Sequence, residues 1–295
     1  MSVSIESCAS RVRGETLHGQ PVVRLSLPCG DSALVALHGA QVISWHTPSG
    51  GEHLFLSDRA VWNGRDAVRG GVPICFPQFN QRGPLAKHGF ARNLPWRLLD
   101  SVVEVDGVTA TLALRDDETT RAWWPHGFDA RLVLSLRAGV LRMALELENT
   151  GKDSWSFTGA LHTYLRVPGI DGMQLDGLSG LARWDAVRDL HGLQRGTVRF
   201  DGEYDSVFAP AAAPLRLRDS AARRSMIIEN SAGWGNVVVW NPGAALCAKL
   251  EDMPAQGYRH MLCVEAACVD RPVMLEPGQR WSGWQQLTQW RAQAH

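Results

Sequence analysis

The sequence predicts an all-β protein, because apolar and polar residues alternate with a period of two through most of the chain. Turn sequences such as PSGG, ENTGK and NPG recur at short intervals, and convincing helical periodicity is scarce. Many strands without long helices favour an antiparallel sandwich or barrel. We therefore expect one continuous β-sandwich domain over residues 1–295, with its core at about residues 20–290.

The clearest strand signal is the segment ARLVLSLRAGVLRMALELENTG. Its leucines alternate with other residues up to a tight turn at Ala138-Gly139, and apolar residues alternate again after the turn. This pattern indicates a hairpin with one buried face. The best helix candidates are short, and we expect them at DSVFAP (205–210) and at QQLTQWRAQAH (285–295).

Composition excludes several classes of partner. Thirty basic residues balance thirty acidic ones, so nucleic acid is not expected as a partner. No apolar run approaches the roughly 18–20 residues of a membrane helix, and the N-terminus lacks the features of a signal peptide. The six cysteines form no C-x-x-C pair and show no zinc-site spacing. We expect a reduced, cytoplasmic monomer that contacts neither nucleic acid nor membrane.

A single carboxylate, Glu265, stands inside the apolar segment MLCVEAACV (261–269). As a strand this segment would be buried on both faces, and an isolated buried charge is costly. Such a group shifts its pKa or finds a partner. Glu265 is therefore a misplaced core residue, the partner of a buried cation, or an acid–base group with a shifted pKa.

His162 is the natural partner for this carboxylate. In SFTGALHTYLRV, strand alternation places His162 on a polar face, as the wall of a cleft would be built. A histidine and a glutamate that face each other across a cleft make an acid–base pair. The alternatives are a hydrogen-bonded structural histidine and a salt bridge between Glu265 and an arginine.

Basic residues gather in the segment from Asp66 to Trp96. Two glycines follow Arg69 and free the backbone to approach a ligand closely, and arginine suits bidentate capture of phosphate or carboxylate. The alternative is a solvated basic loop. The segment contains no nucleotide-binding P-loop. Asp205, in GEYDSVF, is another polar candidate, although alone it would be interpreted as a helix N-cap.

The chain also contains, in order, HGAQVISW, RGGVPICFPQF, KHGFARNLPW, WPHGFDARL, ALHTYLRV, VVWNP and CVEAACV with PVMLEPGQRW. With this ordered set it resembles the aldose 1-epimerase superfamily, and within it the hexose-6-phosphate mutarotases, from about residue 30 to residue 285. The resemblance implies a β-supersandwich fold and an enzyme of carbohydrate metabolism. That enzyme would interconvert the α and β anomers of a sugar phosphate, glucose 6-phosphate first, with no metal and no organic cofactor.

The resemblance also implies roles for individual residues. His162 and Glu265 correspond to the catalytic pair of the family, and Asp205 to a residue that binds sugar hydroxyls. Arg69 and Arg92 correspond to the family's contacts with the substrate and its phosphate. Lys87 and His88, in the same basic segment, are expected to bind the substrate as well. Three positions depart from the common pattern around the presumed sugar pocket and leave the preferred hexose open: Gln78, Asn80 and Gly243. Lys87 also stands where other polar residues occur in the family.

Anomer exchange needs only proton movement. A base removes the proton from the O1 hydroxyl while an acid protonates the ring oxygen. The ring then opens to an aldehyde, rotates about C1–C2 and recloses. We expect Glu265 as the base and His162 as the acid, on opposite sides of the sugar. The alternatives are a mutarotase of unphosphorylated aldoses, a non-catalytic carbohydrate-binding protein, and a glycoside hydrolase or lyase with Asp205 as a second carboxylate.

Overall fold

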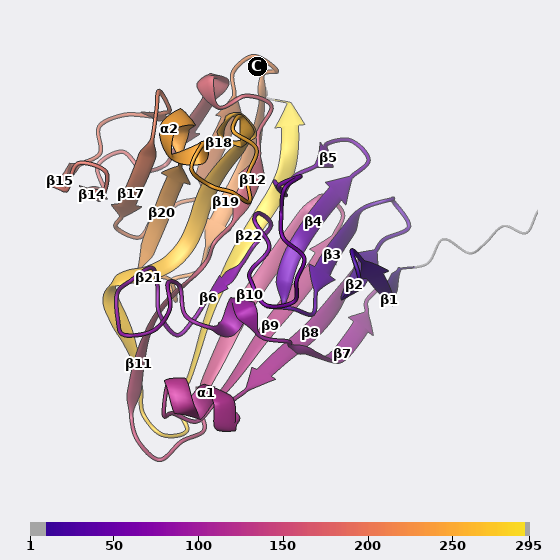
Figure 1. Cartoon of the computed structure of the whole chain (residues 1–295). Coiled ribbons are helices and arrows are strands. Elements are labelled where there is room, and N and C mark those ends of the chain that lie inside the picture. Colours follow the sequence, from indigo (N-terminus) through magenta and orange to yellow (C-terminus); the bar gives the residue numbers. More distant parts are fainter. Residues whose placement is uncertain (1–9, 293–295) are drawn as a thin grey trace, which may run out of the picture.

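The protein, described here by a computed structural model for residues 10–292, consists of three β-sheets with two short α-helices in that range (Figure 1). The strand pairs within these sheets are antiparallel. The all-β prediction is therefore confirmed. The five-stranded sheet runs in sequence order through β1 (Arg11–Leu17), β2 (Gln20–Ser26), β3 (Ser32–Ala36), β4 (Gln41–Thr47) and β5 (Gly51–Glu52).

The nine-stranded sheet combines strands that are far apart in the sequence. Its order is β16 (Val198–Arg199), β13 (Met173–Asp176), β18 (Leu215–Asp219), β19 (Arg224–Asn230), β22 (Arg280–Ala292), β10 (Val140–Asn149), β9 (Phe128–Arg137), β8 (Gly107–Arg115) and β7 (Arg97–Val103).

The eight-stranded sheet carries the candidate site. Its order is β15 (Leu190–Leu193), β14 (Ala182–Asp185), β17 (Tyr204–Phe208), β20 (Asn236–Asn241), β21 (Met261–Leu275), β11 (Trp155–Leu161) and β6 (Ile74–Cys75), with β12 (Tyr164–Arg166) also paired to β21.

Helical structure is confined to short connections. The α-helices are α1 (Glu118–Trp123) and α2 (Gly243–Cys247), and the 3₁₀ turns are η1 (Ala91–Asn93), η2 (Ile170–Gly172) and η3 (Gly257–His260). Asp117 caps α1, because its side chain accepts a hydrogen bond from the backbone N–H of Thr120. Within residues 10–292, no helix is long and apolar enough to cross a membrane.

The main core lies between the nine-stranded sheet and the other two sheets. It includes Leu132 and Leu145 from the nine-stranded sheet, Trp45 from the five-stranded sheet, and Val264 from the eight-stranded sheet. The other face of the eight-stranded sheet packs into separate, smaller clusters, to which Ala267 belongs. Strand β21 is therefore buried on both faces along Met261–Val269, as its apolar sequence predicts.

The predicted hairpin is confirmed as β9 and β10. Leu136 pairs with Leu141 and Leu134 with Met143, so the alternating apolar residues share the face that enters the main core. Gly139 closes the turn with φ +70°, a left-handed conformation that glycine adopts without strain.

The two predicted helices are wrong, because both segments are strands. The first lies in β17, where Val207 and Phe208 are buried on opposite faces of the sheet and hide the alternation. The second lies in β22 up to Ala292, and its remaining residues fall outside the described range. Its register against β19 shifts at a bulge, so Leu287 and Trp290 both point inward at a spacing of three residues. That spacing imitates a helix.

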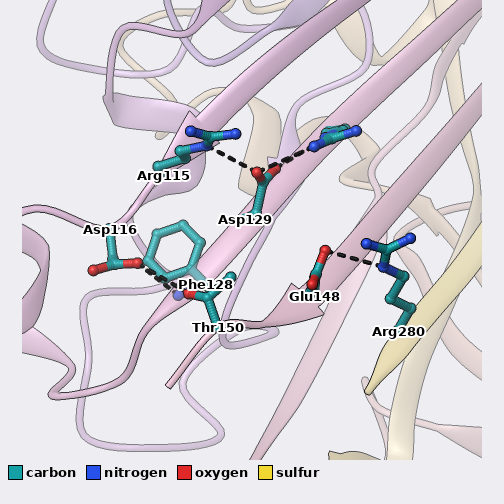
Figure 2. A network of polar contacts seen from close by, with 8 residues as sticks. Arg115, Asp116, Phe128, Asp129, Glu148, Thr150 and Arg280 are labelled. Atoms are coloured by element: carbon teal, nitrogen blue, oxygen red, sulfur yellow. Dashed lines mark hydrogen bonds and ion pairs between the residues drawn. The ribbon is translucent and has the colours of Figure 1, made fainter. Parts of the chain in front are cut away.

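Charged residues join neighbouring strands of the nine-stranded sheet away from the candidate site (Figure 2). The Nε of Arg115 on β8 lies 2.8 Å from a carboxylate oxygen of Asp129 on β9, and the Nε of Arg131 lies 3.1 Å from the other. Arg280 on β22 pairs with Glu148 on β10 at 3.0 Å. Both arginines that line the surface hollow on this sheet, Arg131 and Arg280, are thus paired with carboxylates.

Candidate active site

A cleft of about 280 Å³ opens on the face of the eight-stranded sheet that points away from the main core. Side chains from β12, β17, β20 and β21 form part of its lining, together with the basic segment 66–96. Every site residue predicted from the sequence lines this cleft: Arg69, Lys87, His88, Arg92, His162, Asp205 and Glu265.

Strand register brings the cleft residues together. One row across the sheet pairs Asp205 on β17 with Trp240 on β20, Trp240 with Cys263 on β21, and Cys263 with Tyr164 on β12. Glu265 lies two residues beyond Cys263 on the same strand, so both side chains point to the same face. Residues separated by a hundred positions in the sequence therefore share one wall.

His162 and Glu265 lie side by side on the floor of the cleft. His162 falls in the gap between β11 and β12, both of which pair with β21, and its backbone N–H donates to the carbonyl of Pro73. Its Nε2 is 3.3 Å from Oε1 of Glu265. The expectation that the two groups face each other across the cleft is wrong, because they belong to neighbouring strands of one sheet.

Each member of the pair also keeps a free polar atom. Nδ1 of His162 and Oε2 of Glu265 are buried, and neither has a hydrogen-bond partner among residues 10–292. Buried polar atoms are almost always hydrogen-bonded in proteins, so these two atoms mark a place where a ligand completes the site.

Burial shifts the pKa values of the pair in opposite directions. Burial first, and then the positive charges of Arg92 and Arg69, lower the pKa of His162 to about 3. Burial, followed by the charge of Asp205, raises the pKa of Glu265 well above its usual range. Both effects disfavour the charged forms, so the empty site favours a neutral imidazole beside a protonated carboxyl.

A chain of contacts fixes the imidazole. The ring of His162 stacks on Tyr164, with centroids 4.9 Å apart and planes inclined by 15°. The Tyr164 hydroxyl accepts a hydrogen bond from Nη1 of Arg69 at 2.9 Å, and Nε of Arg69 pairs with Asp252 at 3.0 Å. Arg69 thus reaches the cleft with two of its three nitrogens already engaged.

The double glycine after Arg69 serves chain packing. A Cβ on Gly70 would lie 2.3 Å from the carbonyl oxygen of Phe55, and one on Gly71 would lie 2.2 Å from that of Val42. Both glycines have positive φ. The interpretation that they let a ligand approach the backbone is wrong, because the backbone of Phe55 and of Val42 occupies that space.

Lys87 and Arg92 carry positive charge without a direct ion pair to a carboxylate among the described residues. Nη2 of Arg92 donates to the carbonyl of Lys87 at 2.8 Å, while its buried Nε has no partner in the described part of the chain. Within residues 10–292, neither cation has a carboxylate oxygen within 4 Å. These two side chains are therefore ready to receive an anion.

His88 is a neutral hydrogen-bond donor to the cleft. Its Nδ1 accepts the backbone N–H of Asn80 at 3.2 Å, which assigns the proton of the neutral ring to Nε2. Burial, followed by the charge of His162, lowers the pKa of His88. The rings of His88 and His162 lie edge to face, with centroids 5.4 Å apart.

Asp205 lies on β17 within the cleft wall, so it is not a helix N-cap. Burial raises its pKa to about 6, and the positive charge of Lys87 opposes this shift. Asp205 is therefore ionised at neutral pH and can accept hydrogen bonds from hydroxyl groups of a ligand.

Two of the three unusual positions have structural roles outside the cleft lining. Gln78 is buried and braces its loop by bonds to Asn80 and Leu85, and Gly243 packs its Cα against the backbone of Glu203. Only Asn80 of the three lines the cleft in the described structure. Gln78 and Gly243 therefore lie around the cleft without lining it, since each contacts a residue of the lining, Asn80 or Glu203.

Several cleft residues were not predicted. Tyr164 in the cleft lining and Cys263, which is buried beneath the lining, could have been found, because each lies two residues from a predicted catalytic residue. Trp184 and Arg82 form an opposite rim, with the guanidinium 4.9 Å from the ring centroid. Asp252 reaches Arg69 from a loop, and no local sequence signal points to that contact.

The cleft floor also brings three metal-binding residue types together. Potential ligand atoms of His162, Cys263 and Glu265 all lie within 4.8 Å of one another. Sequence spacing gave no hint of this cluster, because strand pairing rather than a local motif assembles it.

Comparisons with known proteins agree with this fold and site. The sequence matches the family described as Aldose 1-epimerase over residues 21–288. A protein of Cenchrus ciliaris is 34% identical over 264 residues, which cover 85% of this chain and 79% of that protein. One from Escherichia coli (strain K12) is 38% identical over 240 residues, with coverage of 80% and 79%. Both bear the name "Putative glucose-6-phosphate 1-epimerase".

Solved structures show the same architecture. A Salmonella typhimurium protein described as a "putative mutarotase" superposes with a TM-score of 0.86 at 30% identity, covering 94% of this chain and 92% of that one. A galactose mutarotase-like protein from Clostridium acetobutylicum shares the fold, with a TM-score of 0.75 at 14% identity and coverage of 97% and 99%.

The fold and these relatives define an isomerase of the mutarotase class, and its cleft holds a buried histidine–glutamate pair. The chain belongs to the aldose 1-epimerase family, and it is an aldose epimerase. The resemblance inferred from the sequence motifs is confirmed, and the hydrolase and lyase alternatives are set aside.

Proposed function

We propose that the enzyme interconverts the α and β anomers of a hexose 6-phosphate, with glucose 6-phosphate as the first candidate. The observation that carries this proposal is the separation of charge in the cleft. An acid–base pair with two unsatisfied atoms lies on the floor, and two cations that form no direct ion pair in the described chain, Lys87 and Arg92, line the same cleft. The names of the relatives from Cenchrus ciliaris and Escherichia coli support the same substrate.

The proposed pose follows from these two features. The anomeric carbon and the ring oxygen lie against His162 and Glu265, and the 6-phosphate lies between Lys87 and Arg92. Asp205 accepts hydrogen bonds from ring hydroxyls, and His88 donates one from Nε2. Trp240, on the same wall as Asp205, offers an apolar surface to the sugar ring.

Phosphate binding prepares the pair for catalysis. In the empty site the positive charges of Arg92, Arg69 and Lys87 help burial to disfavour an imidazolium. A phosphate dianion compensates those charges, so the proton of Glu265 can move to His162. The pair then consists of a carboxylate base and an imidazolium acid, whose nearest N and O atoms lie 3.3 Å apart in the empty site.

The reaction then uses one proton at each end. Glu265 removes the proton from the O1 hydroxyl while His162 protonates the ring oxygen, and the C1–O5 bond breaks to give the open aldehyde. Rotation about C1–C2 presents the other face of the carbonyl. Ring closure reverses both transfers, so the enzyme ends each cycle in its starting state.

The alternative substrate is the unphosphorylated aldose, which would use the same pair. A sugar without a phosphate would leave Lys87 and Arg92 without an anionic partner. The phosphorylated sugar is therefore favoured as the substrate. The test is an NMR exchange measurement of anomer interconversion on glucose 6-phosphate, galactose 6-phosphate, glucose and galactose. A kcat/KM that is higher for a free sugar than for its 6-phosphate would overturn the proposal.

A further inference from the structure

The three residues at the cleft floor have the composition of a zinc site with one position open. His162, Cys263 and Glu265 offer an imidazole nitrogen, a sulfur and a carboxylate oxygen within 4.8 Å of one another. Catalytic zinc sites typically use three such protein ligands and leave the fourth position to water or substrate. The remaining polar atoms of two of these side chains, His162 Nδ1 and Glu265 Oε2, are buried without a partner in the described chain, so no other hydrogen bond holds the two groups in place.

We propose that the cleft floor binds a thiophilic divalent cation, Zn²⁺ in the first place, through His162, Cys263 and Glu265, and that the bound metal inhibits the epimerase. The metal would occupy the acid–base pair itself, so metal and sugar exclude each other. This role is the opposite of a cofactor, and it requires no metal in the catalytic cycle.

The distances between the three ligand atoms are close to those of a tetrahedral zinc site, so only a small side-chain movement is needed. With zinc bonds of about 2.0–2.2 Å to nitrogen and oxygen, a tetrahedral site places those two atoms roughly 3.3 Å apart. Nε2 of His162 and Oε1 of Glu265 are already separated by 3.3 Å. The zinc–sulfur bond is longer, so the sulfur must come within roughly 3.5 Å of the other ligands. The 4.8 Å limit of the cluster leaves a side-chain movement of at most roughly 1.3 Å.

The ligand types select the cation. Mg²⁺ and Ca²⁺ prefer oxygen ligands, and a thiolate with an imidazole selects Zn²⁺ and similar softer ions. Binding requires the thiol of Cys263 and the carboxyl of Glu265 each to release a proton to solvent. The resulting thiolate and carboxylate balance the two charges of the ion, so the site stays neutral beside the cations Arg69 and Arg92.

The cleft provides both the entrance and the fourth ligand. His162 and Glu265 line the cleft, whereas Cys263 lies fully buried behind them. An ion that enters from the cleft meets the pair first and the sulfur last. Its open coordination position then faces the space that the sugar would occupy.

Strand β21 supplies a matched control. Cys268 is also buried, but it belongs to the main core on the opposite face of the same strand. A Cys268→Ala variant therefore removes a buried thiol from β21 and leaves the cluster intact. If Cys263→Ala folds poorly, Cys263→Ser keeps the size of the side chain and weakens the metal ligand.

The direct test uses Co²⁺, because cobalt bound to a thiolate gives a charge-transfer absorption band. Chelator-treated full-length enzyme is titrated with Co²⁺ and then with Zn²⁺. We expect the band in the native protein and in Cys268→Ala, its loss in Cys263→Ala, and its displacement by Zn²⁺. Zinc affinity should fall at least roughly tenfold in Cys263→Ala, since even the loss of an outer partner of a metal ligand costs 10- to 100-fold.

The kinetic test separates this site from the proposed substrate. Zn²⁺ should raise the KM for the sugar and leave kcat unchanged, and a chelator should restore the original KM. A band that survives in Cys263→Ala, or equal zinc affinity in the native and Cys263→Ala proteins, would refute the metal site. The absorption measurement does not depend on catalysis, so it stands whether or not the enzyme acts on a 6-phosphate.

Discussion

Nε2 of His162 lies 3.3 Å from Oε1 of Glu265, on the floor of a cleft that also contains the cations Lys87 and Arg92. This relationship allows the two groups to exchange one proton directly. The ionisation state of the pair therefore depends on what else the cleft holds, because nearby positive charge disfavours the imidazolium and a bound anion favours it.

The acid–base pair is tested by removing each ionisable group at nearly constant size. His162→Asn and Glu265→Gln should each lower the anomer exchange rate by at least roughly a hundredfold, as expected for the loss of a general acid or base. The double variant should lose much less than the product of the single losses, because the two groups act as a unit. NMR exchange spectroscopy measures all three rates.

The control for this pair is His260→Asn, an exposed histidine whose Nδ1 faces the carbonyl of Pro168. The anomer exchange rate of the His260→Asn variant should match that of the native enzyme. Native-like exchange in His162→Asn or in Glu265→Gln would refute the assignment.

Arg92 should discriminate between phosphorylated and free sugars. If it binds the phosphate, its charge-assisted hydrogen bonds contribute roughly 1.5–3 kcal/mol. Arg92→Ala should then lower kcat/KM for glucose 6-phosphate by roughly 10- to 100-fold, mainly through KM, and change that for glucose little. Arg280→Ala is the matched control, because Arg280 pairs with Glu148 (Figure 2) and does not line the cleft. An equal decrease in kcat/KM for both sugars would favour the unphosphorylated aldose as the substrate.

Arg69 should behave differently, because it already binds Asp252 and Tyr164. Arg69→Gln should loosen the tyrosine on which His162 stacks, and so lower kcat for glucose 6-phosphate and glucose alike with little change in KM. Tyr164→Phe keeps the stacked ring and loses only the hydroxyl, so it should lower kcat less. If an Arg69 variant instead lost kcat/KM for glucose 6-phosphate and kept it for glucose, as expected of Arg92→Ala, Arg69 would be assigned to phosphate binding.

The fold was largely predictable because local alternation encodes it. The β9–β10 hairpin and the polar face with His162 and Tyr164 follow from a period of two. The strand assignment failed at β22, where a bulge shifts the register and places Leu287 and Trp290 inward together. An irregularity of this kind depends on the neighbouring strand, which the local sequence does not reveal.

The sequence predicted several residues of the cleft lining but not their arrangement. Motifs identified His162 and Glu265, yet their contact on one sheet depends on the order of β11, β12 and β21. Such pairings join residues about a hundred positions apart. Asp252 illustrates the same limit, because only the folded chain brings its loop to Arg69.

Asp205 should give the affinity for a free sugar a pH dependence. Burial raises its pKa to about 6, so it is a carboxylate above that pH and a neutral acid below it. A carboxylate accepts stronger hydrogen bonds from hydroxyl groups. The KM for glucose should therefore rise as the pH falls through about 6. Glucose is used because the phosphate of the 6-phosphate itself titrates near pH 6.

The matched variant for this titration is Asp205→Asn, which keeps the size and cannot ionise. Its KM for glucose should be higher than that of the native enzyme at pH 8 and nearly constant between pH 5 and 8. A native KM that does not change across pH 6 would show that the charge of Asp205 plays no part in binding.

His162 should remain neutral in the empty enzyme across the physiological range. Burial, together with the charges of Arg92 and Arg69, lowers its pKa to about 3, so the ring gains a proton only well below pH 5. NMR chemical shifts of its ring nitrogens should therefore stay constant between pH 5 and 8.

Arg92→Ala should raise the pKa of His162 by removing a positive neighbour, and Arg280→Ala should not. Inorganic phosphate should raise it in the native protein and less in Arg92→Ala, because the anion then lacks one of its two proposed partners. If His162 titrates near its usual pKa of 6.5 in the empty enzyme, the proposed control of the pair by phosphate is wrong.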